Sequence, residues 1–157
     1  MRLACVEDAA FIVGCFAVSH AKPFLRKPSP ERACAAVEDP DVVSLVLEAD
    51  GVPAGHLLLR RLTDTWSITE ISQLVVCEPR RGHGRFAIEF AKHFAFSERG
   101  AHRLHLDVVA HNTAARKLYE FCGFTYEGTF RDGFPADDGA FCDLAIYGML
   151  ESEFRTL

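Results

Sequence analysis

A Gly-x-Gly turn flanked by arginines, at residues 80–85, directly follows the apolar run of residues 74–77. The glycines Gly82 and Gly84 let backbone N–H groups approach a ligand closely. A helical pattern begins at Phe86, and a helix N-terminus adds unpaired donors and partial positive charge. We therefore expect this segment to hold a phosphate group at the junction of a strand and a helix.

Three histidines near the candidate elements offer a second kind of chemistry. His83 lies in the turn, His105 belongs to an alternating strand pattern, and His111 precedes a helix start. None has a partner at the spacing typical of a metal site, so no metal is expected and each histidine is a weak candidate base. The six cysteines are scattered without a CxxC pair, which predicts reduced thiols.

Bulk properties limit the class of protein. The chain has 157 residues, which fits one domain spanning residues 1–157. The formal net charge of −5 argues against a general nucleic-acid binder, which usually carries a basic face. No apolar run approaches the roughly 20 residues needed to span a bilayer, and the start does not resemble a secretory signal. We expect a cytoplasmic protein with no membrane partner.

The turn and cap signals divide the chain into short elements. Ser29 with Pro30 begins a helix, Asp50 with Gly51 marks a hairpin, and Gly100 ends a long helix. Periodicity predicts strands at 2–6, 42–49, 53–62, 66–76, 103–109, 124–131 and 140–150, and helices at 7–18, 30–38, 84–99 and 112–122. This order predicts an α/β (α+β) fold: one mixed, mostly antiparallel sheet of about seven strands flanked by about four helices.

Two segments in this order and separation resemble the GNAT superfamily of acyl-CoA-dependent N-acyltransferases. The first is the Arg-Gly-x-Gly turn, and the second combines Asn112, Thr113, Ala115, Leu118, Tyr119, Gly123 and Phe124. The later stretch from Tyr126 to Asp143 resembles the branch that contains ribosomal-protein N-terminal alanine acetyltransferases. The resemblance covers essentially the whole chain and implies acetyl transfer from acetyl-CoA to a primary amine.

The resemblance also implies where acetyl-CoA binds. The backbone of Leu74, Val75 and Val76 is expected to run beside the pantetheine arm, where one N–H can polarise the acetyl carbonyl. Pro79 takes the first position of the family pattern Gln/Arg-x-x-Gly-x-Gly, which moves phosphate binding onto main-chain groups. The expected diphosphate contacts come from Arg81, Gly82, His83, Gly84, Arg85 and Phe86.

Three further residues take roles in proton transfer or cofactor contact. Asn112 and Tyr119 are seven residues apart, so they project from one helix face. Tyr119 is the expected general acid for the leaving thiolate, because a phenol has a reference pKa of about 10 against about 8.5 for a thiol. Asn112 is expected to cap its helix and touch the cofactor arm. Glu70 is the expected general base. It lies four strand residues, or about 13 Å, before Leu74, so it is expected to act on the amine through water.

The acceptor is not fixed by the sequence. The basic loop at residues 21–30 and the acidic loop at residues 131–139 are expected to wall its cleft, with Phe24, Trp66, Phe130 and Phe134 as lining candidates. A peptide N-terminus, a polyamine, an aminoglycoside and an amino sugar all remain open, and a homodimer is allowed. Two alternatives to an enzyme are a non-catalytic acyl-CoA-binding regulatory module and a CoA-independent interaction domain.

Overall fold

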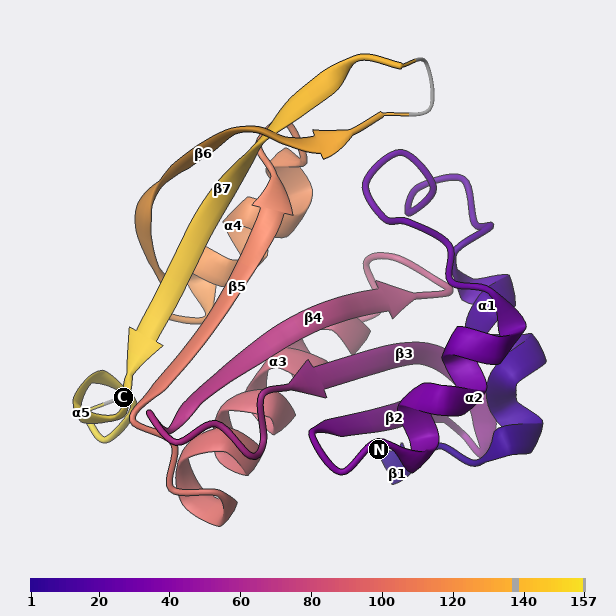
Figure 1. Ribbon diagram of the computed structural model, residues 1–157, viewed down its shortest axis with the longest axis horizontal. Coiled ribbons are helices and arrows are strands. Elements are labelled where there is room, and N and C mark those ends of the chain that lie inside the picture. The colour runs from indigo at the N-terminus through magenta and orange to yellow at the C-terminus, as the bar shows by residue number, and fades with distance from the viewer. Residues whose placement is uncertain (137–138, 157) are drawn as a thin grey trace.

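The computed structural model describes residues 1–136 and 139–156. Within these residues seven strands form one mixed sheet in the order β1-β2-β3-β4-β5-β7-β6 (Figure 1). Only β4 and β5 pair in parallel, and every other neighbouring pair is antiparallel. The predicted fold class is therefore confirmed. The strands are β1 (Arg2–Leu3), β2 (Val42–Ala49), β3 (Val52–Arg60), β4 (Ile68–Val76), β5 (Arg103–Val109), β6 (Thr125–Pro135) and β7 (Phe141–Leu150).

The helices of the described chain include one more than the expected four, because a short helix follows the last strand. The α-helices are α1 (Ala9–Cys15), α2 (Pro30–Glu38), α3 (His83–His93), α4 (Thr113–Phe121) and α5 (Glu151–Phe154). A 3-10 helix, η1 (Val6–Asp8), precedes α1, and a π-helical segment, η2 (Phe94–Glu98), follows α3. None of these described helices is long and apolar enough to cross a membrane.

Local signals in the sequence place several of these boundaries correctly. The Ser29 side chain accepts from the backbone N–H of Arg32 and caps α2. Asp50 and Gly51 both have positive φ, as a tight two-residue hairpin between β2 and β3 requires. Gly100 has a φ of +64°, so it can end the helical segment before β5.

Several predicted boundaries are wrong: the helix expected over 7–18 is divided into η1 and α1, which ends at Cys15, and the strands expected at 53–62 and 66–76 begin or end up to two residues away. Three further differences change an element more strongly. The first strand ends at Leu3 rather than residue 6, because Asp8 turns back to Arg2 and shapes the chain into η1. The helix expected over 84–99 becomes π-helical from Phe94, so that α3 ends at His93. The segment 131–135, expected in a loop, continues β6 through a register shift between Phe130 and Phe134.

The two faces of the sheet bury different side chains. Leu57 and Leu59 of β3 belong to the larger core cluster, which includes Ile88 of α3 and Tyr119 of α4. On the opposite face Val46 and Val75 pack with residues of α1 and α2, among them Ile12 and Ala33, in a second cluster. Each face of the sheet is thus covered by its own pair of helices (Figure 1).

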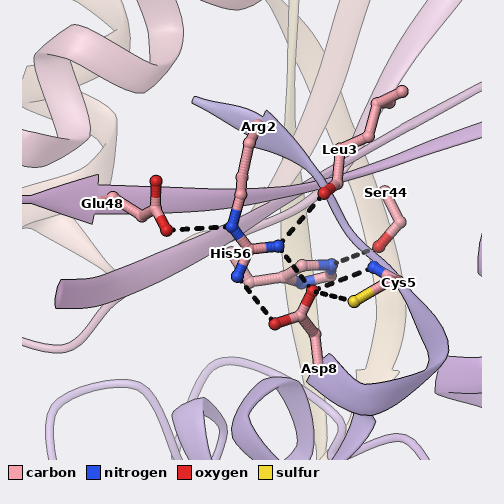
Figure 2. A network of polar contacts seen from close by, with 7 residues as sticks. All are labelled: Arg2, Leu3, Cys5, Asp8, Ser44, Glu48 and His56. Atoms are coloured by element: carbon pink, nitrogen blue, oxygen red, sulfur yellow. Dashed lines mark hydrogen bonds and ion pairs between the residues drawn. The ribbon is translucent and has the colours of Figure 1, made fainter. Parts of the chain in front are cut away.

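A polar network fixes the N-terminal strand (Figure 2). Two nitrogens of Arg2, Nη1 and Nη2, donate to the two carboxylate oxygens of Asp8 at 2.7 and 2.8 Å. The backbone N–H of Cys5 also donates to Asp8, and Glu48 accepts from Nε of Arg2 at 2.9 Å. The Arg2 guanidinium holds the pKa of the Asp8 carboxyl well below its usual range.

The cysteines are free thiols, in agreement with the sequence-based expectation. Burial raises the pKa of the Cys15 thiol to about 12, with its neighbour Cys77 adding to the shift. The Sγ atoms of these two cysteines lie 3.7 Å apart. Cys122 is buried as well, with a raised pKa, which fits a packed thiol rather than a nucleophile.

Candidate active site

The sheet opens between its two parallel strands. Strand β4 pairs with β5 only from Ile68 to Glu70, although β4 continues to Val76 and β5 to Val109 (Figure 1). Beyond Glu70 the edge of β4 therefore has no strand partner on the β5 side among the described residues. Leu74 and the two valines after it, whose backbone is expected to bind pantetheine, lie on this unpaired stretch.

A bulge in β4 accompanies this opening. Leu58 of β3 pairs with Gln73, whereas Leu59 pairs with Ile71, so Ser72 is an extra residue in β4. A bulge of this kind bends the strand and increases its local twist. It occurs just after the last pairing with β5, where β4 must turn away from its neighbour.

The Gly-x-Gly turn leads directly into α3, as expected. Gly82 has a φ of +80° and occupies the N-cap position without a side-chain cap. The amide of Phe86 closes the first helical turn onto the carbonyl of Gly82. The preceding amides of His83, Gly84 and Arg85 have no acceptor within the described chain, so three donors point out of the helix start. This arrangement fits a diphosphate.

The arginines beside the turn differ in their freedom. Arg81 donates to Glu78 at 3.2 Å in an exposed ion pair, so a phosphate would compete with that carboxylate. Arg85 lies over the ring of Phe121 at 4.8 Å. A Cβ on Gly84 would lie 3.0 Å from Leu118, so glycine also allows α3 to approach α4 closely.

Tyr119 is a buried residue of α4, only 8% exposed. Its ring contacts Phe124 and Tyr147, yet its hydroxyl has no hydrogen-bond partner in the described residues. The Tyr147 hydroxyl, in contrast, accepts from Arg116 and donates to Glu120. Burial raises the pKa of Tyr119, with the charge of Asp107 adding to the shift, so the phenol stays protonated at neutral pH.

Asn112 caps α4, as expected, and does so by accepting from the backbone N–H of Ala115 at 3.2 Å. This bond uses the side-chain oxygen as an acceptor. The amide nitrogen of the side chain keeps its two donors for a ligand or solvent.

Glu70 belongs to a cluster of titratable groups that sequence reasoning identifies only in part. It pairs with His105 across the strands, and its charge contributes to the pKa values of both His105 and Asp107. Burial lowers the pKa of His105, against the opposing effect of Glu70. The pKa of Asp107 is raised, first because burial penalises the charged carboxyl and second because Glu70 repels it. Three proton-handling groups thus meet where β4 and β5 separate.

An ion pair next to this cluster was not predicted. Arg103 of β5 donates to Glu127 of β6 across the intervening strand β7, with Nη1 2.6 Å from Oε1. A Cβ on Gly148 of β7 would lie within 2.7 Å of both side chains, so this glycine makes room for the pair. Glu127 is the extra residue at a β6 bulge, a placement that sequence alone does not indicate.

The loop between α1 and α2 contacts the far side of the opening. Phe24 packs against His111 with ring centroids 5.4 Å apart, and Arg26 donates to the carbonyl of Pro135 and lies over Phe134. The loop at residues 21–30 and the β6–β7 hairpin, both expected to wall the acceptor cleft, therefore contact each other. Asp137 and Asp138, expected in the acidic wall, lie outside the described residues.

Two aromatic candidates for the lining do not fit that role. Trp66 precedes the first residue of β4, at the opposite end of the strand from Val76, and is 77% exposed. Its position explains the error: the loop that carries it joins β3 to β4 at the closed end of the opening. Phe130 is also largely exposed, at 62%.

The comparisons with known proteins agree with this geometry. The family model described as acetyltransferase (GNAT) family matches residues 10–124, more than half of the chain. No curated protein matches.

Solved structures similar to this chain include acetyltransferases. One is a chimera of the spermidine N-acetyltransferase SpeG from Vibrio cholerae and hSSAT, with a TM-score of 0.83, 22% identity, and coverage of 99% of this chain and 98% of that chain. A dodecameric spermidine N-acetyltransferase from Vibrio cholerae has a TM-score of 0.79, 22% identity, and coverage of 98% and 94%. A probable acetyltransferase has a TM-score of 0.82, 23% identity, and coverage of 97% and 92%.

At these identities the structural similarity shows the fold, and it extends over nearly the whole chain. The family match covers the strand β4, the glycine turn and the helix that carries Tyr119. The chain therefore belongs to the GNAT family of acetyltransferases.

Proposed function

We propose that this acetyltransferase moves an acetyl group from acetyl-CoA to a primary amine by direct attack. The observation that carries the proposal is the opening between β4 and β5 after Glu70 and His105. Strand edges left unpaired at that point need other hydrogen-bond partners, and the amide groups of a pantetheine arm supply them. The α3 N-terminus, with three free amides, is the proposed diphosphate site.

Residues at the opening supply the groups that the proposed reaction needs. The amine nitrogen attacks the thioester carbonyl carbon, whose oxygen accepts from a backbone N–H among Leu74, Val75 and Val76. Glu70 accepts the ammonium proton through water. After the attack, the nitrogen loses its second proton to water. The C–S bond then breaks, and the Tyr119 hydroxyl donates its proton to the departing thiolate before solvent returns one to the phenolate oxygen. The products are the N-acetylated amine and CoA with a free thiol.

Several acceptor classes enter the test of this proposal. The sequence resemblance to ribosomal-protein N-terminal alanine acetyltransferases supports a peptide N-terminus. The spermidine N-acetyltransferases among the similar structures support a polyamine. Aminoglycosides and amino sugars are the remaining acceptor classes. Self-association and a cytoplasmic location also remain predictions.

A thiol-release assay with acetyl-CoA tests the proposal against peptides, polyamines, aminoglycosides and amino sugars. We expect release of CoA that depends on one of these amines. Binding of acetyl-CoA measured by calorimetry, combined with no transfer to any amine, would favour the regulatory module instead. A failure to bind CoA at all would favour an interaction domain.

A further inference from the structure

A cavity of about 130 Å³ lies between helices α1 and α2 and the sheet, on the face opposite α3. Four cationic side chains line it, and no acidic residue among the described parts of the chain does. Each of these four residues, together called the rim of the cavity, is exposed. They are Arg26, Lys27, Arg32 and Arg60.

The rim cations form no ion pair within the described parts of the chain. Lys27, Arg32 and Arg60 take part in none of the ion pairs among those residues. Arg26 donates to a backbone carbonyl, that of Pro135. Four adjacent cations repel one another, so a bound anion would relieve the repulsion. Their clustering in a chain of net charge −5 is the feature to be explained.

The floor of the cavity is polar and buried. Ser44 and His56 line it with 5% and 2% of their surface exposed, and Oγ of Ser44 lies 3.0 Å from Nε2 of His56 (Figure 2). Burial lowers the pKa of His56 to about 4, so the ring is neutral at pH 7 and carries one proton. With that proton on Nε2, His56 donates to Ser44, and the serine hydroxyl is free to donate into the cavity.

The cavity adjoins the proposed reaction centre. Gln73, which also lines it, immediately precedes Leu74 on the unpaired stretch of β4. Arg60 pairs with Glu70 across β3 and β4, which places their Cα atoms about 5 Å apart. A cationic subsite therefore lies beside the carboxylate proposed to receive the ammonium proton.

We propose that this cavity binds an anionic group, a carboxylate or a phosphate, on the acceptor amine. The acceptor is then an acidic amine, with its ammonium group near Glu70 and its anion held by Arg60 and the other rim cations. This inference rests on the proposed acetyl transfer. A cavity of this volume suits a small anionic group rather than an entire drug-sized ligand, and its rim repels a polyamine.

Matched pairs of amines test the inference in the thiol-release assay. The pairs are β-alanine with its carboxamide and phosphoethanolamine with ethanolamine, with spermidine as a cationic reference. We expect kcat/KM to be at least tenfold higher for the anionic member of one pair than for its neutral member. The pair that shows this preference tells whether the cavity binds a carboxylate or a phosphate. Equal rates within both pairs, or a preference for spermidine, would overturn the inference while leaving acetyl transfer intact.

Charge variants link that preference to the cavity. Arg60→Gln and Arg32→Gln should raise KM for the anionic amine at least tenfold and leave KM for its neutral partner and for acetyl-CoA unchanged. Arg155→Gln, which removes the same charge far along the chain in an exposed pair with Glu151, should change none of these values. A similar loss in Arg155→Gln would indicate a general charge effect and contradict the subsite.

A binding measurement separates this inference from the proposed function. Inorganic phosphate is titrated by calorimetry with CoA present to fill the turn at α3. The anion site is supported if phosphate binds the unmodified chain and Arg60→Gln weakens that binding at least tenfold. If no amine is acetylated in the thiol-release assay, that result refutes acetyl transfer but not the anion site. No phosphate binding, with transfer to neutral amines or polyamines, would refute the anion site alone.

Discussion

Glu70 of β4 and His105 of β5 occupy the last position at which the two parallel strands pair, and the sheet opens directly beyond them. Glu70 therefore lies at the closed end of the opening rather than in its middle. Asp107, two residues further along β5, has its pKa raised in part by the charge of Glu70. The charge of the proposed base therefore acts on a second carboxylate across the opening.

Replacing Glu70 by Gln removes this charge while keeping the size of the side chain. We expect kcat/KM to fall by about 10²-fold, with the largest loss at low pH. The reason is that the fraction of free amine falls about tenfold for each pH unit below the amine pKa, so a base matters most there. A pH–rate profile of both proteins measures this effect.

The same substitution carries an independent readout. Without the charge of Glu70, the pKa of Asp107 should fall, which NMR titration of the carboxyl carbons can follow. Glu38→Gln, at the exposed end of α2, serves as the matched control and should alter neither measurement. A loss of activity that is equal at every pH would rule out a base role for Glu70.

Tyr119→Phe should separate chemistry from binding. We expect kcat to fall by about 10²-fold while the dissociation constant for acetyl-CoA stays nearly constant. Stability should also change little, because the hydroxyl that is removed has no hydrogen-bond partner in the described residues. Steady-state kinetics, calorimetry and thermal unfolding measure the three quantities.

A control for this substitution is Tyr126→Phe, which removes a hydroxyl that lies 2.7 Å from Thr129 at an exposed position of β6. It should leave kcat unchanged. Unchanged turnover in Tyr119→Phe itself would eliminate the phenol as the general acid, whatever the control shows.

Features that depend on near neighbours in sequence could be predicted. Ser29 and Asn112 cap their helices through residues three positions away, and Asp50 with Gly51 forms its hairpin locally. The glycine turn belongs to the same class, because its donors are backbone groups of consecutive residues. The physical requirement and the residues that meet it lie within one short window of sequence.

Features that depend on distant parts of the chain were missed. Glu70 and Asp107 come from different strands, and only the parallel register of β4 and β5 brings them together. The basic cavity combines Arg60 of β3 with Arg32 of α2, which sequence places in unrelated segments. Neither His93 nor Phe94 is a turn or breaker residue, so the change from α-helical to π-helical geometry at Phe94 could not be predicted from the local sequence.

Gly82→Ala tests the turn at the start of α3. The φ of +80° costs about 1–2 kcal/mol for a residue with a Cβ, although no atom lies within 4 Å of that Cβ. We expect a loss of about 1 kcal/mol in the free energy of unfolding. We also expect at least tenfold weaker CoA binding, because relieving the strain moves the free amides of His83 and Gly84.

Gly100→Ala supplies a closely matched control. Gly100 also has a positive φ, +64°, and open space around its Cβ position, but it lies after η2 at the other end of the helical segment. It should lose similar stability in urea unfolding and keep its CoA affinity. Equal CoA affinities in both variants would show that the turn does not hold the phosphates.

Asp8→Asn tests the network that fixes the N-terminal strand. The carboxylate accepts from Arg2 and from the backbone of Cys5 in a buried position (Figure 2). We expect the free energy of unfolding to fall by about 1–2 kcal/mol at pH 7. Glu48→Gln removes the other partner of Arg2, at a more exposed position, and should cost less.

The dependence of this loss on pH identifies its source. The pKa of Asp8 is lower in the folded chain than in the unfolded chain, so its stabilisation is complete above about pH 5. The stabilisation shrinks as the pH falls through about 4 toward the lowered folded pKa, because the unfolded chain then binds the proton first. Urea unfolding at pH 7 and pH 3 should therefore show a smaller difference between Asp8→Asn and the unmodified chain at pH 3. A difference of the same size at both values would assign the loss to packing rather than to the carboxylate charge.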